Sequence, residues 1–252
     1  MKLAKSLILG SVLTAVLISA ASAGVREEHV TGGALDLVWQ PGFGVPNVLQ
    51  PLTLSPADPG YANPSGDHTV GDAINSPAQA GGGIILSCTD PAGFDDYSWE
   101  GWVFLGDGNT RRGLVVRADP GASFQSCYQF VIYAGLGHVD FRKLIVQSPT
   151  TLGTWNTNTL PGGFPQPNSW HHMKIEAVGN VFRCWWDATQ LTAPPYGVPI
   201  LDSSLPTGWV GVYNFRFDLG GVPVYFDDLI LDGFVTPTRP ASWGAIKALY
   251  RR

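Results

Sequence analysis

Charged residues are scarce in this sequence, and those present do not form a basic cluster. Asp, Glu, Lys and Arg make up 14% of the 252 residues, and the formal net charge is −5. Nucleic-acid binding depends on Lys and Arg side chains that neutralise phosphates, so the composition argues against that function. Attraction to acidic membrane surfaces needs the same side chains and is disfavoured for the same reason.

Long helical patterns are also missing. The chain is rich in turn residues, with 31 Gly and 20 Pro, and it carries 9 Trp. Val, Ile, Thr and aromatic residues occur in short runs between the turn residues, which is typical of β-strands. After residue 23, no apolar run is long enough to span a membrane. The composition therefore predicts an all-β protein.

The one long apolar run lies at the N-terminus. Lys2 and Lys5 form a basic head, residues 7–18 are almost wholly apolar, and residues 21–23 (Ala-Ser-Ala) form a small-residue cleavage motif. This arrangement is typical of a secretory signal peptide, whereas a membrane anchor needs about 20 apolar residues. We expect residues 1–23 to be removed and the mature protein to be extracellular, on the cell surface or in the periplasm.

Cysteine is rare, with Cys88, Cys127 and Cys184 as its three occurrences. Export permits a disulfide, but three thiols cannot all pair within one chain. The cysteines are too far apart in the sequence for a zinc knuckle. We expect at most one disulfide and a buried thiol, and the pairing stays open.

The remaining sequence is predicted to form one domain over residues 24–236. Short strand-like segments cover residues 34–39, 83–88, 97–105, 113–118, 128–134, 139–147, 170–187, 209–214 and 224–231. Strands at this spacing, with turn residues between them, indicate a sandwich or barrel. Residues 41–79 are dense in Pro, Gly, Asn and Asp and are predicted to be a long ordered coil, with one short strand near residues 48–54. Residues 237–252 form a tail with a predicted short amphipathic helix.

The clearest local structure is a β-hairpin over residues 169–187. Gly179-Asn180 is a two-residue turn with Gly first, which favours a type II′ turn. The resulting register gives the hairpin an apolar face of Met173, Ile175, Ala177, Phe182, Cys184 and Trp186. On the other face, Glu176 lies opposite Arg183 and Lys174 lies opposite Trp185. We expect the apolar face in the core and the polar, aromatic face at solvent or ligand.

Five ordered segments carry a family resemblance. They are residues 112–119 (RGLVVRAD), residues 128–132 (YQFVI), the Trp170 hairpin with Gly179-Asn180, residues 208–213 (GWVGVY) and residues 225–229 (YFDDL). Together they resemble the concanavalin A-like jelly-roll domain, in its LamG-like and DUF1080-like (3-keto-disaccharide hydrolase-like) variants. The resemblance implies two antiparallel sheets, one concave, with ligands on or near the concave side. Lectins, glucanases, adhesion modules and enzymes share this fold, so it does not fix the function.

The same resemblance implies a structural Ca²⁺ between an early loop and the last strand, where Asp227 and Asp228 match. Carboxylate oxygens are the ligands that Ca²⁺ prefers, and the extracellular setting supplies the ion. Because neighbouring residues on a strand point to opposite faces, one of the two carboxylates is expected to point outward. The turn at residues 107–109 (Asp-Gly-Asn) is interpreted as a hairpin turn.

Support for catalysis is weaker. Glycosidases need two carboxylates around the scissile bond, and the strand with two Glu flanking an Asp, found in glucanases that resemble this fold, is absent. Glu176 has a partner in Arg183, which leaves Glu100 as the best catalytic candidate, although we favour a solvated strand position for it. The adjacent His171 and His172 point to opposite faces of a strand and cannot jointly bind a metal.

Sugar binding fits the non-core side chains better. Aromatic rings stack on pyranose faces while polar groups bridge hydroxyls. The candidate ligand residues are Trp102, Arg117, Gln129, Tyr133, Lys174, Arg183 and Trp185, which could form one surface, whereas Trp99, Trp170 and Trp186 are expected in the core. We therefore favour a secreted, non-catalytic module that binds glycan or another surface polymer. A glycan-active enzyme using Glu100 or a clustered Asp, and a structural cell-surface protein, are the alternatives.

Overall fold

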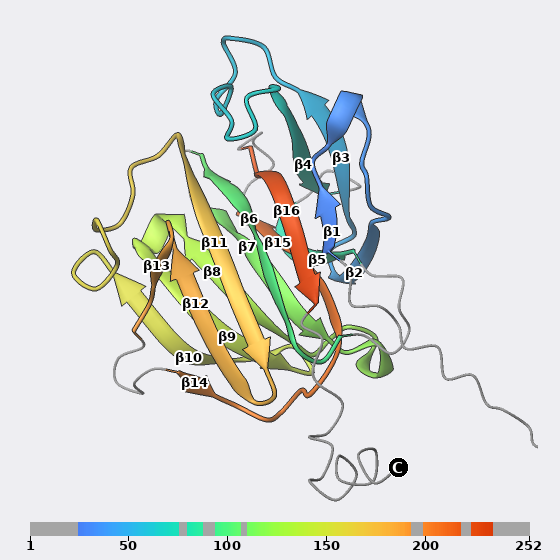
Figure 1. The fold of residues 1–252 in the computed structure, drawn as a ribbon, viewed down its shortest axis with the longest axis vertical. Helices are drawn as coiled ribbons and strands as arrows, with labels where there is room; N and C mark the ends of the chain where they lie inside the picture. Colours follow the sequence, from blue (N-terminus) through green and yellow to red (C-terminus); the bar gives the residue numbers. More distant parts are fainter. Residues whose placement is uncertain are drawn as a thin grey trace, which may run out of the picture.

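The computed structural model describes residues 25–75, 80–87, 94–106, 110–192, 199–217 and 223–233. These residues form two antiparallel β-sheets that face each other across one core (Figure 1). The predicted signal peptide, Cys88, the turn at 107–109 and the tail with its predicted helix lie outside the described residues. No helix in the described ranges is long and apolar enough to cross a membrane.

The first sheet, sheet A, has the strand order β13-β12-β11-β6-β16-β4-β3. These strands are Thr189–Gln190 (β13), Val181–Trp186 (β12), Ser169–Val178 (β11), Tyr97–Leu105 (β6), Tyr225–Gly233 (β16), Thr69–Asn75 (β4) and Asn47–Thr53 (β3). Strand β1 (Val25–Glu28) pairs with the second half of β16, and β14 (Ile200–Leu201) pairs with β12. The last strand of the described chain thus lies in the middle of sheet A, beside strands from the N-terminal part.

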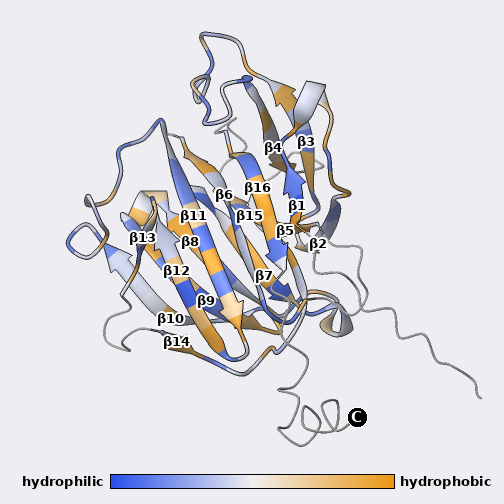
Figure 2. Cartoon of the chain, in the orientation of Figure 1, coloured by the Kyte–Doolittle hydropathy of each residue, from blue (hydrophilic) through white to orange (hydrophobic). Residues whose placement is uncertain are grey.

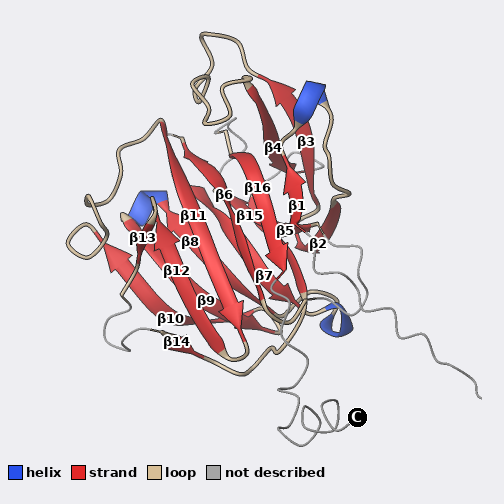
Figure 3. Cartoon of the chain, viewed as in Figure 1, coloured by secondary structure: helices blue, strands red, loops and turns tan. Residues whose placement is uncertain are grey.

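The second sheet, sheet B, has the order β10-β9-β8-β7-β15-β5-β2. Its strands are Ser148–Asn156 (β10), His138–Ile145 (β9), Cys127–Tyr133 (β8), Thr110–Ala118 (β7), Trp209–Arg216 (β15), Gly81–Leu86 (β5) and Gln40–Gly44 (β2). The helical elements described are three short 3-10 turns, η1 (Thr31–Gly33), η2 (Pro120–Ala122) and η3 (Ala134–Leu136) (Figure 3).

The core between the sheets is aromatic. Its largest fully buried hydrophobic side chains are Trp99, Trp155, Trp186, Tyr97, Tyr128, Phe130, Phe141, Phe182 and Phe226. Hydrophobic and hydrophilic residues alternate along the second half of β11, as expected for a strand with one face in the core (Figure 2). The prediction of an all-β jelly-roll sandwich is confirmed.

The hairpin register predicted from the turn is confirmed. Val178 pairs with Val181, Glu176 with Arg183 and Lys174 with Trp185. Gly179 has φ 55, whereas Asn180 is not among the residues with positive φ, which is the sign pattern of a type II′ turn.

The prediction of a strand over residues 34–39 is wrong. This segment instead surrounds the carboxylate of Glu28, which is fully buried. The backbone N–H groups of Asp36 and Leu37 donate to the Glu28 carboxylate at 2.8 and 2.9 Å, and Trp39 Nε1 donates at 2.8 Å. Because a buried carboxylate needs several donors, these N–H groups satisfy Glu28 rather than a strand ladder.

The long coil predicted over residues 41–79 is wrong in part. The structure places all of β3 and β4, and most of β2, in it, and β3 agrees with the one short strand predicted near residues 48–54. Both prolines that obscured these strands, Pro41 in β2 and Pro51 in β3, lie on the outermost strands of their sheets. An edge strand tolerates Pro because one row of its N–H groups has no ladder partner to lose.

Candidate functional site

The predicted ligand residues do not form one surface. Trp102, Lys174, Arg183 and Trp185 lie on β6, β11 and β12 of sheet A, whereas Arg117, Gln129 and Tyr133 lie on β7 and β8 of sheet B. The two sheets pack face to face, so their outer faces point in opposite directions. The sequence shows which residues alternate on a strand but not which sheet the strand joins.

Arg117 is a core residue rather than a ligand residue. Its side chain is fully buried, and its Nη1 and Nη2 donate to the carbonyls of Leu205 at 3.0 Å and Asp95 at 2.9 Å. Its guanidinium lies 4.9 Å from the ring centroid of Phe182. Arg117 has φ 50 next to a register shift between β7 and β15, so a bulge turns its side chain inward.

Gln129 and Tyr133 are engaged within the outer face of sheet B. Arg142 Nε and Nη2 donate to Gln129 Oε1 at 2.9 and 2.6 Å, and Arg142 Nη1 donates to the Tyr133 hydroxyl. The rings of Tyr133 and Tyr213 flank the Arg142 guanidinium. Gln129 is 0% exposed and Tyr133 is 8% exposed, so the prediction that both face a ligand is not supported by their burial.

The outer face of sheet A carries the polar, aromatic surface expected of the hairpin. Arg183 Nη1 lies 2.6 Å from Glu176 Oε1, and Lys174 Nζ lies 6.0 Å from the ring centroid of Trp185. Lys174 Nζ also donates to Glu100 Oε1 at 3.0 Å. Glu100 is therefore a partly exposed strand residue on the outer face of sheet A, where it is ion-paired with Lys174.

A hollow of about 590 Å³ opens on this face beside the start of β11. It is lined by Trp102 from β6, by Trp170 and His172 from β11, and by Asp187 and Ala188 from the turn after β12. Trp102 and His172 are cross-strand partners, with ring centroids 5.1 Å apart at an interplanar angle of 66°. Two indole rings and a carboxylate thus share one open concavity.

Trp170 was expected in the core, and that prediction is wrong. It lies on the outer side of sheet A, where its ring centroid is 5.3 Å from that of Phe104. Its Nε1 donates to the Gly60 carbonyl at 3.0 Å, which fixes the indole against the loop between β3 and β4. Trp99 and Trp186 are in the core as predicted.

The turn at Asp187-Ala188 forms one wall of the hollow. Both residues have positive φ, 44 and 66, as a type I′ turn requires. A left-handed conformation is unfavourable for Ala, so other contacts must hold the turn. Asp187 Oδ1 accepts from the His172 backbone N–H at 2.9 Å, and the Asp187 N–H donates to the His172 carbonyl at 2.9 Å.

A chain of contacts through Ser169, His171 and Asp187 supports the same turn. Ser169 Oγ lies 2.7 Å from His171 Nε2, and His171 Nδ1 lies 2.8 Å from Asp187 Oδ2. This connectivity resembles a hydrolase triad. However, Ser169 Oγ also donates to the Gln166 carbonyl at 2.6 Å, and neither Ser169 nor His171 lines the hollow. We therefore interpret the chain as a support that fixes the Asp187 carboxylate.

His172 supplies the imidazole of the hollow. Burial lowers the pKa of His172 below its usual value, although nearby carboxylates oppose the shift. The ring is thus neutral at pH 7. His171 stacks on Trp186 at 4.7 Å on the core side of the strand, so the two histidines point to opposite faces as predicted.

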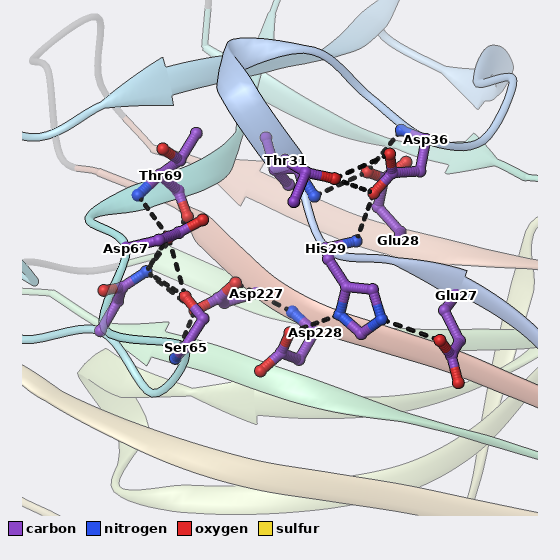
Figure 4. Close-up of polar contacts among 12 residues, drawn as sticks. Glu27, Glu28, His29, Thr31, Asp36, Ser65, Asp67, Thr69, Asp227 and Asp228 are labelled. Carbon is purple, nitrogen blue, oxygen red and sulfur yellow. Dashed lines mark hydrogen bonds and ion pairs between the residues drawn. The ribbon is translucent and has the colours of Figure 1, made fainter.

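The structure also separates the two predicted metal ligands, Asp227 and Asp228 (Figure 4). His29 lies between Asp228 Oδ1 at 2.7 Å and Glu27 Oε2 at 2.9 Å. Hydrogen bonds from these carboxylates raise the pKa of His29 to about 9. Asp228 therefore has a cationic partner of its own, and His29 was not singled out by the sequence.

Asp227 faces the loop that precedes β4. Four oxygen atoms surround Asn63 Nδ2, namely Ser65 Oγ at 2.8 Å, Asp67 Oδ1 at 3.3 Å, Thr69 O at 3.1 Å and Asp227 Oδ2 at 3.0 Å. An amide nitrogen has two hydrogens, fewer than these four acceptors. Burial raises the pKa of Asp227 to about 6, although Ser65 opposes the shift.

This donor set fits Ca²⁺. Residues 63, 65, 67 and 69 follow the alternating spacing by which calcium loops present side-chain oxygens and then a backbone carbonyl. Asp227 would add a carboxylate from β16. A rotated Asn63 amide would add Oδ1, at the loss of the hydrogen bond that Oδ1 accepts from the His68 N–H at 3.1 Å. No three His, Cys, Asp or Glu side chains among the described residues come together as a metal site, so the fit depends on the neutral oxygens.

Comparison with solved structures identifies the architecture. The CBM66 carbohydrate-binding module from Bacillus subtilis aligns over 79% of this chain and 98% of its own, with TM-score 0.54 and 17% identity. The fold is a concanavalin A-like jelly roll. A β-glucanase from Bacillus licheniformis aligns over 84% and 99% of the two chains, with TM-score 0.50 and 11% identity. The exoplasmic/lumenal domain of VIP36, in a Ca²⁺/Man2-bound form, aligns over 78% and 84%, with TM-score 0.50 and 9% identity.

Sequence comparison assigns no family to this jelly roll, because no family model and no curated protein matches the chain. The finer likeness to LamG-like and DUF1080-like domains therefore stays a prediction.

Proposed function

We propose that this jelly roll is a secreted, non-catalytic carbohydrate-binding module whose ligand occupies the hollow of sheet A. The observation that carries the proposal is the pair of indoles, Trp102 and Trp170, beside His172 and Asp187. Indole rings stack on the apolar faces of sugar rings, and a carboxylate accepts hydrogen bonds from hydroxyls. Structural neighbours that include a carbohydrate-binding module support the assignment at the level of the fold.

The test is a binding measurement on soluble oligosaccharides and a glycan array, with the mature chain and two tryptophan variants. Trp102→Ala removes one stacking surface and is expected to weaken binding about tenfold or more, the usual cost of losing a central aromatic contact. Trp209→Ala is the matched control, because Trp209 lies on sheet B. Equal binding by Trp102→Ala and the wild-type protein, or no binding to any glycan, would contradict the proposal. Release of reducing sugars would favour the enzymatic alternative.

We also propose that the loop around Asn63 and the Asp227 carboxylate hold a structural Ca²⁺. The ion would give the four oxygens around the Asn63 amide a cation to coordinate, and its charge would offset the burial of the Asp227 carboxylate. We expect Ca²⁺ to raise the melting temperature and EDTA to reverse the rise. Asp227→Asn should abolish this response, whereas Asp228→Asn should retain it because Asp228 pairs with His29. A response that survives in Asp227→Asn would contradict the site.

A further inference from the structure

We propose that the hollow of sheet A takes an amino sugar, a sugar unit that carries a protonated amine. The proposal rests on the glycan-binding function above and adds the charge of the unit that is bound. Its basis is charge complementarity between a cationic ligand and the side chains around the hollow.

The lining of the hollow is anionic. Among the described residues that line it, Asp187 is the one that carries a formal charge at pH 7, because His172 is neutral and the others are two Trp and Ala188. The side chain of Asp187 is 42% exposed, so the carboxylate is accessible. His171 Nδ1 and the His172 N–H contact one oxygen each, and every carboxylate oxygen can accept a second hydrogen bond.

The indole rings that line the hollow also favour a cationic ligand. The face of an indole ring carries partial negative charge, and an ammonium group is attracted to it more strongly than to other aromatic side chains. Trp102 and Trp170 both line the hollow. An amine held between an indole face and a carboxylate gains a cation–π contact and a charge-assisted hydrogen bond at once.

Lys174, the nearby cation, does not neutralise the negative charge of the hollow. Lys174 Nζ is 3.0 Å from Glu100 Oε1 and is therefore paired on the sheet. The second Glu100 oxygen lies 3.5 Å from His172 Nε2, on the side of the hollow. The same arrangement opposes a sugar acid, because a uronate would meet the carboxylate of Asp187 and the two indole faces. The hollow thus distinguishes amino sugars from neutral sugars, and neutral sugars from sugar acids.

Three hexasaccharides with the same β-1,4 linkage test the proposal by isothermal titration calorimetry on the mature chain. They are built from glucosamine, from N-acetylglucosamine, whose amine is neutralised by acetylation, and from glucose. We expect the glucosamine hexamer to bind about tenfold more tightly than either neutral hexamer at low ionic strength. The preference should shrink as salt is added, because an open hollow is screened.

Two variants distinguish attraction to the hollow from attraction to the overall negative charge of the protein. Asp187→Asn should remove most of the preference for glucosamine, so that the three hexamers bind with similar affinity. Asp119→Asn removes the same charge from the loop at η2, where Asp119 caps the Gly121 N–H, and should leave the preference unchanged. Thermal melts of both variants verify that the turn and the loop still fold.

The outcomes distinguish this proposal from the function on which it rests. Tighter binding of a neutral hexamer, or a preference that persists in Asp187→Asn, overturns the amino-sugar assignment and leaves glycan binding in place. A preference lost equally in Asp119→Asn shows attraction to the whole surface and also overturns it. No binding by any hexamer, together with a negative glycan array, overturns both proposals.

Discussion

The two sheets are built from strands of similar length, yet their outer faces differ in polarity and burial. On sheet A the outer face carries ion pairs, indoles and an open hollow. On sheet B it forms a second hydrophobic cluster in which Ile84, Leu86, Val115 and Val131 are at most 1% exposed. The second face of an antiparallel sheet is thus not solvated by default. Side-chain polarity alone would not show this difference, because Arg142 and Gln129 lie in the buried face.

The sharpest test of this contrast removes one cation from each face. Arg142→Ala on sheet B should lower the free energy of unfolding by about 3 kcal/mol, because it leaves the buried Gln129 carbonyl and the Tyr133 hydroxyl without their partner. Lys174→Ala on sheet A should cost less than about 1 kcal/mol, because its pair with Glu100 is partly exposed to solvent. Urea denaturation measures both values. Equal losses would mean that the two faces are buried to the same extent.

The pH dependence of stability tests the environment of one carboxylate, Asp227, at the margin of sheet A. The pKa of Asp227 is about 6 in the folded protein, against an ordinary value of 3.8. Folding therefore takes up a proton between these values, so the contribution of Asp227 to stability falls as the pH rises from 3.8 through 6. In EDTA, Asp227→Asn should gain melting temperature relative to the wild-type protein across this window. A difference between the two proteins that is independent of pH would refute the shift.

The smallest effect is expected at the ion pair between Glu176 and Arg183. The side chain of Arg183 is 36% exposed, and surface ion pairs contribute about 0.2–1 kcal/mol. Arg183→Ala should therefore change the unfolding midpoint only slightly, and high salt should reduce the change further. A loss of several kcal/mol would show that this end of the face resembles sheet B.

Local pattern predicted the strands and the hairpin well. The Gly179-Asn180 turn set a register that the structure reproduces at every pair. Contacts between distant segments were harder to predict from the sequence, because they depend on which strands become neighbours. Trp170 faces outward because it alternates in phase with Lys174 and Glu176 on β11. The loop around Gly60 then covers it, and nothing near Trp170 in the sequence indicates that loop.

Buried charges were the second source of error. Glu28 lies near the start of the predicted mature chain, and the segment after it curls around its carboxylate. Arg117 occupies an alternating outer position, and a bulge reverses its direction. Gly and Pro occur near both segments and are typical of irregular backbone. Burial itself depends on the assembled sandwich and leaves no local trace.

The pairing of β1 with β16 has a consequence for the order in which the chain folds. Val25 lies opposite Asp232 and Glu28 lies opposite Leu229, so contacts between the two ends of the described chain complete the middle of sheet A. Contacts this distant in sequence form slowly, since a long loop must close before they give any stability. Sheet A cannot be completed until β16 has been synthesised. A chain that emerges N-terminus first could therefore not complete sheet A until almost all of it had emerged.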